Sequence, residues 1–121
     1  MNEKLGNAIV GYGGMGGFHT RFTSTQPFLE TYGIYDIDPD KRAKAKADGF
    51  GVYETLEELL SDERVKLITV ATPNDVHCPI CIAAMKAGKN VVCEKPVAMS
   101  SDELALMIKT ADECGVVFTV N

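Results

Sequence analysis

Three glycines and one aspartate near the amino terminus have the types and the spacing needed to hold a dinucleotide. Residues 8–16 read Ala-Ile-Val-Gly-Tyr-Gly-Gly-Met-Gly, an apolar run that opens into G-x-G-x-x-G, and Asp36 lies twenty positions after Gly16. Gly11 permits the tight turn from strand to helix, Gly13 has no Cβ to keep the backbone from a pyrophosphate, and Gly16 lets the helix pack closely on its strand. The amino end of that helix presents free N–H groups to the phosphate charge. We therefore expect a dinucleotide cradle here, with a structural turn that holds no ligand as the alternative.

Asp36 also bears on which dinucleotide is bound. A carboxylate at the end of the second strand can accept hydrogen bonds from the adenosine ribose hydroxyls, and it repels the 2′-phosphate of NADP. Ile37 follows it rather than the arginine that often partners this phosphate, although Lys41 and Arg42 are near enough to soften the repulsion. Asp38 is a competing ribose acceptor, but the proline after it marks it as a helix cap. The sequence predicts NAD rather than NADP.

The composition excludes several classes of partner. The chain has 121 residues, enough for one domain with a buried core, and 45% of them are hydrophobic. Its net charge of −5 argues against a grip on the nucleic-acid backbone and against attraction to an anionic membrane surface. No stretch reaches about eighteen uninterrupted apolar residues, the length that would span a bilayer. The first residues lead directly into a strand without a secretion signal, so we expect a cytoplasmic protein.

Strand and helix signals alternate along the whole chain. Apolar runs bounded by glycines or polar turns predict strands, and amphipathic stretches between them predict helices. The predicted strands are 7–11, 33–36, 51–53, 65–71, 91–94 and 116–120. This rhythm is typical of a Rossmann-type α/β fold: a doubly wound, parallel, six-stranded sheet with helices on both faces, in a single domain over residues 1–121.

Capping signals mark several helix ends. Asp38 reads as an N-cap followed by Pro39 at the first helical position, and Gly49 is well placed to end that alanine-rich helix. Residues 55–58 begin with Thr and end with Glu, which is a capping box, and residues 100–103 form another with Ser and Glu. We expect two further helices: one runs from the glycine turn to near residue 26, and the other ends at residue 88.

The cysteines invite a redox or metal interpretation. Cys78 and Cys81 form C-x-x-C near the start of a predicted helix, with His77 next to them. A thiol there can have a lowered pKa, but a zinc site needs four ligands and no second pair stands at a suitable spacing. Cys93 and Cys114 are isolated within a strand and near a helix end. We predict reduced, packed thiols and no metal site, with a functional dithiol as the alternative.

Two further strings make the sequence similar to a known family. Residues 71–77 read Ala-Thr-Pro-Asn-Asp-Val-His, residues 94–96 read Glu-Lys-Pro, and the glycine loop continues as Gly-Gly-Phe-His over 16–19. This set, in this order, resembles the amino-terminal domain of the glucose–fructose oxidoreductase and inositol dehydrogenase (Gfo/Idh/MocA) family, over essentially the whole chain. The resemblance implies an NAD(P)-dependent oxidoreductase that acts on sugars, cyclitols and related polyols as small-molecule substrates.

The resemblance also implies the site residues. Lys95 would be catalytic, its ammonium near nicotinamide C4 orienting a substrate hydroxyl, while Glu94 would face the nicotinamide ribose. His77 is included as a cofactor neighbour, with helix capping or packing as its alternative role. The cofactor-binding set is Gly11, Tyr12, Gly13, Gly14, Met15, Gly16, Asp36, Ile37, Ala71, Thr72, Pro73, Asn74, His77, Glu94, Lys95 and Pro96.

Members of the family carry a second α/β domain that builds most of the substrate pocket and supplies an acid/base histidine. We therefore expect these 121 residues to be the cofactor domain of a longer enzyme, one that binds NAD but does not turn over substrate alone. A non-enzymatic, NAD-sensing regulatory module is the alternative function, and a methyltransferase is a weaker one. The oligomeric state stays open: the chain could be a monomer, or a homo-oligomer paired through apolar surface.

Overall fold

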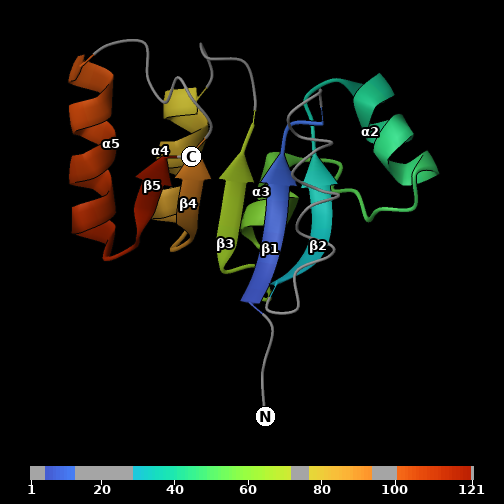
Figure 1. The fold of residues 1–121 in the computed structure, drawn as a ribbon, viewed down its shortest axis with the longest axis horizontal. Helices are drawn as coiled ribbons and strands as arrows, with labels where there is room; N and C mark the ends of the chain where they lie inside the picture. Colours follow the sequence, from blue (N-terminus) through green and yellow to red (C-terminus); the bar gives the residue numbers. More distant parts are fainter. Residues whose placement is uncertain (1–4, 13–28, 72–76, 94–100, 121) are drawn as a thin grey trace.

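A parallel sheet of five strands forms the centre of the computed structural model, which describes residues 5–12, 29–71, 77–93 and 101–120. The strand order is β2-β1-β3-β4-β5, and every neighbouring pair is parallel (Figure 1). The strands are β1 (Leu5–Val10), β2 (Leu29–Tyr35), β3 (Leu67–Val70), β4 (Asn90–Cys93) and β5 (Phe118–Val120). β1 lies between β2 and β3, so the chain reverses its direction of winding there.

The prediction of six strands is not confirmed. The segment predicted as the third strand, 51–53, forms an isolated bridge between Val52 and Ile34 at the outer side of β2. Ile34 also donates its backbone N–H to the carbonyl of Gly51 and accepts one from Tyr53, each over 2.9 Å. The position is that of the outermost strand in a doubly wound sheet, but the segment is too short to form a ladder before the next helix begins.

Four helices are described: α2 (Pro39–Ala47), α3 (Leu56–Leu60), α4 (His77–Lys86) and α5 (Ser101–Cys114). Two predicted caps are confirmed, since the Asp38 side chain accepts from the N–H of Asp40 and Thr55 accepts from that of Glu58. Gly49 follows α2 with a φ of 95°, as expected at a helix end. The helix predicted after the glycine turn and the cap at residue 100 lie outside the described residues. None of the described helices is long and apolar enough to cross a membrane.

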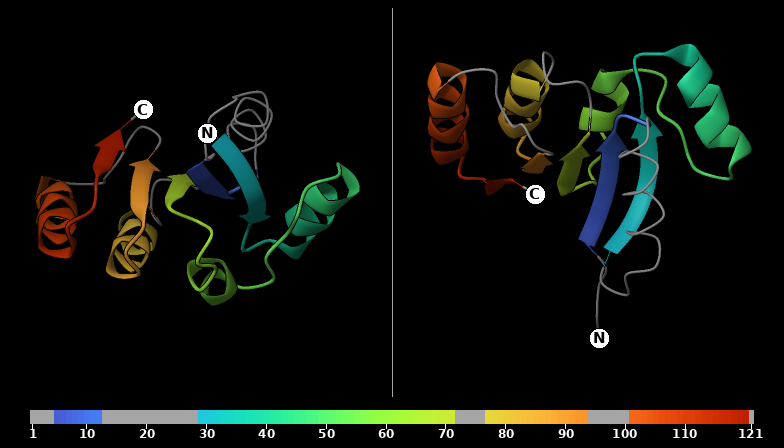
Figure 2. Two further views of the ribbon diagram at one scale, coloured as in Figure 1. Left: turned by 90° about the horizontal axis from the view of Figure 1, so that it is seen from below. Right: turned by 45° about the horizontal axis from the view of Figure 1, so that its top comes forward.

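Hydrophobic cores lie on both faces of the sheet because successive strand residues point in opposite directions. Ala8 and Val10 belong to the larger core, which includes residues of α3, α4 and α5. Ile9, between them, packs in a second core with Ile34 and with Ala45 of α2. Figure 2 (left) shows α4 and α5 side by side on one face of the sheet. The prediction of a parallel α/β sheet with helices is therefore confirmed.

A polar cluster ties the loop before β3 to its surroundings. The Asp62 carboxylate accepts hydrogen bonds from the Tyr53 hydroxyl and the Arg64 guanidinium, each over 2.7 Å. Lys89 is buried and donates from Nζ to the carbonyls of Asp62 and Val65, over 2.9 and 2.8 Å. The ammonium group of Lys89 is thereby paired with two backbone oxygens although its side chain is buried.

Candidate cofactor site

The predicted site segments all leave the sheet at one edge. Val10 at the end of β1 pairs with Tyr35 of β2 and Val70 of β3, and Val70 pairs with Cys93 of β4. Because parallel strands end at the same edge, the glycine loop, the Asp36 turn and the segments after β3 and β4 all start there (Figure 1). Ligands of open α/β sheets bind outside this edge, at the point where winding reverses. Here that point is between β1 and β3.

Asp36 joins the glycine loop to the turn that follows β2. Its side chain is buried, Oδ2 accepts from the backbone N–H of Tyr12 over 2.8 Å, and Oδ1 accepts from that of Asp38 over 2.9 Å. Gly11 has a φ of 106° and donates its N–H to the Tyr35 carbonyl over 2.7 Å. This conformation suits glycine and not L-residues with a side chain. Each carboxylate oxygen keeps a second lone pair, so Asp36 can still accept two hydroxyl groups.

Among the described contacts, Tyr12 meets the site through its backbone. Its hydroxyl donates to the Asp48 carboxylate over 2.6 Å, and its ring packs edge-on against Phe50 with centroids 6.2 Å apart. The side chain is buried against the carboxyl end of α2. The predicted cofactor residue Tyr12 therefore anchors the start of the glycine loop while its N–H fixes Asp36.

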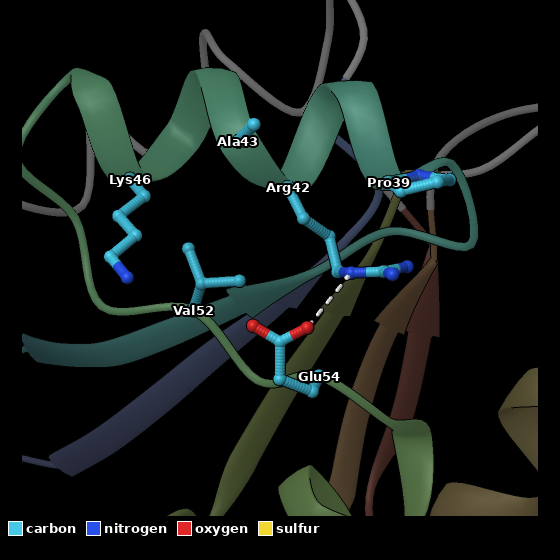
Figure 3. Close-up of a pocket in the computed structure, with 6 residues that line it drawn as sticks. All are labelled: Pro39, Arg42, Ala43, Lys46, Val52 and Glu54. Carbon is cyan, nitrogen blue, oxygen red and sulfur yellow. Dashed lines mark ion pairs between the residues drawn. The ribbon is translucent and has the colours of Figure 1, made fainter.

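The turn after Asp36 carries one exposed apolar side chain, and an arginine side chain from α2 contacts the turn. Ile37 is 83% exposed, which suits a contact with a flat apolar group such as an adenine ring. Arg42 reaches back from α2 and donates from Nη1 to the carbonyls of Asp36 and Ile37, over 2.7 and 3.2 Å. Its Nε lies 3.6 Å from the Glu54 carboxylate. A pocket of about 230 Å³ opens beside this ion pair (Figure 3), and it is lined by Pro39, Arg42, Ala43, Lys46, Val52 and Glu54.

The other predicted residues are placed only in part. Ala71 is half-buried at the site edge and donates its N–H to the Val10 carbonyl over 2.8 Å. His77 begins α4. The predicted residues outside the described part of the chain are Gly13, Gly14, Met15, Gly16, Thr72, Pro73, Asn74, Glu94, Lys95 and Pro96. The sequence does not predict the contacts of Arg42 with the turn or of Tyr12 with Asp48, because no local sequence pattern indicates them.

Three of the four cysteine side chains lie in the hydrophobic core. Cys78, Cys81 and Cys93 are buried, and Cys114 is exposed. Burial raises the pKa of the Cys78 thiol, and a hydrogen bond with Cys93 together with burial raises that of Cys81. Thiols of this kind are poor nucleophiles, which favours packing over dithiol chemistry. Within the described residues no group of three or more His, Cys, Asp or Glu side chains is arranged to hold a metal ion.

Comparison with known proteins gives one consistent result. The family profile described as an oxidoreductase family with an NAD-binding Rossmann fold (Gfo/Idh/MocA) matches residues 5–121. Inositol 2-dehydrogenase of Rubrobacter xylanophilus is 30% identical over 116 residues, which cover 94% of this chain and 33% of that protein. Glucose-6-phosphate 3-dehydrogenase of Bacillus subtilis is 36% identical over 116 residues, or 94% of this chain and 32% of that protein.

Solved structures agree. An NAD-binding protein from Listeria innocua superposes with a TM-score of 0.94 at 43% identity, over 98% of this chain and 35% of that one. GenD2 from gentamicin A biosynthesis, solved with NAD, gives 0.93 at 36% identity, over 100% of this chain and 35% of that one. Biliverdin reductase from Synechocystis, solved with NADP⁺, gives 0.89 at 25% identity, over 97% of this chain and 37% of that one. The chain thus spans about a third of the length of its relatives.

Proposed function

Because the chain belongs to the Gfo/Idh/MocA family of oxidoreductases, as its NAD-binding Rossmann domain, we propose that it holds NAD for hydride transfer to and from a small alcohol. The substrate class we propose for the whole protein is a polyol, cyclitol or sugar-like alcohol. Relatives named as inositol and glucose-6-phosphate dehydrogenases support that class.

The buried Asp36 carboxylate is the observation that carries the choice of NAD. Two backbone N–H groups hold it at the edge where β1 and β2 end, with lone pairs left for two ribose hydroxyls. A 2′-phosphate would bring like charge against this carboxylate. Arg42, a cation that reaches this turn from α2, already donates to two carbonyls and pairs with Glu54. We infer that the site accepts NAD in preference to NADP.

The rest of the proposed machinery rests on the family motifs. NAD supplies the hydride acceptor when it is bound. We propose that Lys95 orients the substrate hydroxyl, that Glu94 balances its charge and faces the nicotinamide ribose, and that Pro96 fixes the backbone after the lysine. Thr72, Pro73 and Asn74 would line the middle of the cofactor. The acid/base histidine would come from a further domain, so the 121 residues by themselves are expected to bind cofactor without turnover.

Calorimetric titration with NADH and NADPH tests the proposal. We expect Asp36→Asn to weaken NADH binding by about tenfold or more and to bring the two affinities closer, because the ribose hydroxyls lose a charged acceptor. Asp38→Asn is the matched control: it removes the same charge two residues away, and asparagine caps α2 as well as aspartate does. An equal loss in both variants, or no binding of either dinucleotide by the unmodified chain, would contradict the proposal.

A further inference from the structure

Arg42 is the described side chain that most directly holds the turn carrying Asp36. It projects from the first half of α2, and its side chain is only 19% exposed. One nitrogen, Nη1, donates to the Asp36 carbonyl over 2.7 Å and to the Ile37 carbonyl over 3.2 Å. The same guanidinium lies beside the carboxylate of Glu54 (Figure 3). Glu54 directly follows the segment 51–53 that bridges to β2, and its side chain is 71% exposed.

The turn depends on such side-chain contacts for its shape. Inside it, the Asp36 carboxylate accepts the N–H of Asp38, while the two carbonyls beside it point to Arg42. Hydrogen bonds from a guanidinium to carbonyl oxygens are charge-assisted, and its planar fork donates in fixed directions. Arg42 therefore fixes the two main-chain peptide groups on either side of Ile37, one of which begins at Asp36. The Asp36 carboxylate, which starts from that main chain, is fixed with it.

We propose that Arg42 is a positioning residue for the ribose-binding carboxylate and not a ligand of the cofactor phosphates. This inference rests on the proposed function, since it concerns the same Asp36. Glu54, just after the bridge segment 51–53, faces Arg42, and Lys46 lines the same pocket from α2. Asp36 and Asp38 are the charged groups of the turn itself. Because Nη1 and Nε of Arg42 already contact the protein, loss of this side chain should act through Asp36 and should weaken NADH binding.

Two variants separate this role from simple attraction between charges. Lys46→Ala removes a positive charge from the same face of α2, one turn along, where the described structure shows no hydrogen bond to the Asp36 turn. Arg42→Lys keeps the charge but loses the planar fork. A positioning role predicts that Arg42→Ala and Arg42→Lys both weaken NADH binding and that Lys46→Ala does not.

The experiment is calorimetric titration of the chain with NADH and NADPH, with Arg42→Ala made alone and together with Asp36→Asn. We expect Arg42→Ala alone to raise the NADH dissociation constant by about tenfold. In the Asp36→Asn background the same change should matter by no more than about twofold, because two residues that act through one contact are not additive. Lys46→Ala should stay within about twofold of the unmodified chain. Additive losses, or a selective loss of NADPH binding in Arg42→Ala, would overturn the inference.

A cofactor-free measurement distinguishes this inference from the proposed function. Amide hydrogen exchange should quicken at Tyr12 and Asp38, the two donors to Asp36, in Arg42→Ala but not in Lys46→Ala. Unchanged exchange at both amides in a chain that still binds NADH would overturn the inference alone. Failure of the unmodified chain to bind NADH would overturn the proposed function, and this inference with it.

Discussion

Asp62 shows how one side chain can hold a loop at the edge of the sheet opposite the cofactor site. Its carboxylate accepts hydrogen bonds from the Tyr53 hydroxyl, from the Arg64 backbone N–H and from two nitrogens of the Arg64 guanidinium. The side chain is 12% exposed. The Arg64 guanidinium is the main reason that the pKa of Asp62 lies well below its ordinary value. The folded protein therefore favours the ionised carboxylate more than the unfolded chain does.

A stability difference that depends on pH follows from this carboxylate. We expect Asp62→Asn to lower the free energy of unfolding by about 1–3 kcal/mol at neutral pH, because charge-assisted bonds are lost in a largely buried place. Since the pKa is lowered by folding, the stabilisation is complete above the unfolded value of about 3.9 and declines as the pH falls below it. Urea unfolding at a series of pH values from neutral to about pH 3 measures this. The difference in the free energy of unfolding between Asp62→Asn and the parent should become smaller as the pH falls. Asp112→Asn, at an exposed position of α5, is the control. A loss of stability in Asp62→Asn that stays constant down to about pH 3 would contradict the assignment.

At the scale of elements, β1 and the loop before β3 approach so closely that only glycine fits between them. A Cβ built on Gly6 would collide with the backbone carbonyl of Arg64. The Gly6 carbonyl also accepts the N–H of Lys66 over 2.9 Å, so the two segments cannot easily separate. We expect Gly6→Ala to cost about 1–3 kcal/mol or more in urea unfolding and, in chains that still fold, to leave NADH affinity unchanged, since this is the opposite edge of the sheet. Leu5→Ala, at a 41% exposed neighbour, is the control; equal stability of Gly6→Ala and the parent would show that the loop can move away.

The elements also show why sequence reasoning succeeded where it did. The caps at Asp38 and Thr55 are contacts between residues a few positions apart, so their spacing is visible in the sequence. Whether 51–53 becomes a strand depends on how many residues reach β2, and only Val52 forms a bridge. The position of Asp36 directly after β2, beside the start of the glycine loop, could be predicted from the sequence spacing. The partners of Arg42 and Tyr12 could not, because α2 must first be packed on the sheet before they meet.

At the scale of the whole molecule, alternation along β1 divides the interior into two cores, and their contents differ. The described residues of the core beside α2 flank the Asp36 turn and the start of the glycine loop. The larger core, which includes residues of α4 and α5, contains three of the four cysteines. Among the described helices, α2 braces the side chains at the Asp36 turn, whereas the packing of the other helices protects the three buried thiols.

Because three thiols lie in the larger core, their reactivity measures how readily that core opens. With an aromatic disulfide reagent under native conditions, we expect one thiol, Cys114, to react quickly, because it is exposed. Cys78, Cys81 and Cys93 should react only as fast as the molecule opens, since they are buried and the pKa values of the first two are raised. In concentrated guanidinium chloride all four should react at once, and Cys114→Ser should abolish the fast native phase and nothing else. Rapid native reaction at Cys78 or Cys81 would instead restore the dithiol interpretation of the C-x-x-C motif, and it would show that α4 separates from β4 more readily than its packing implies.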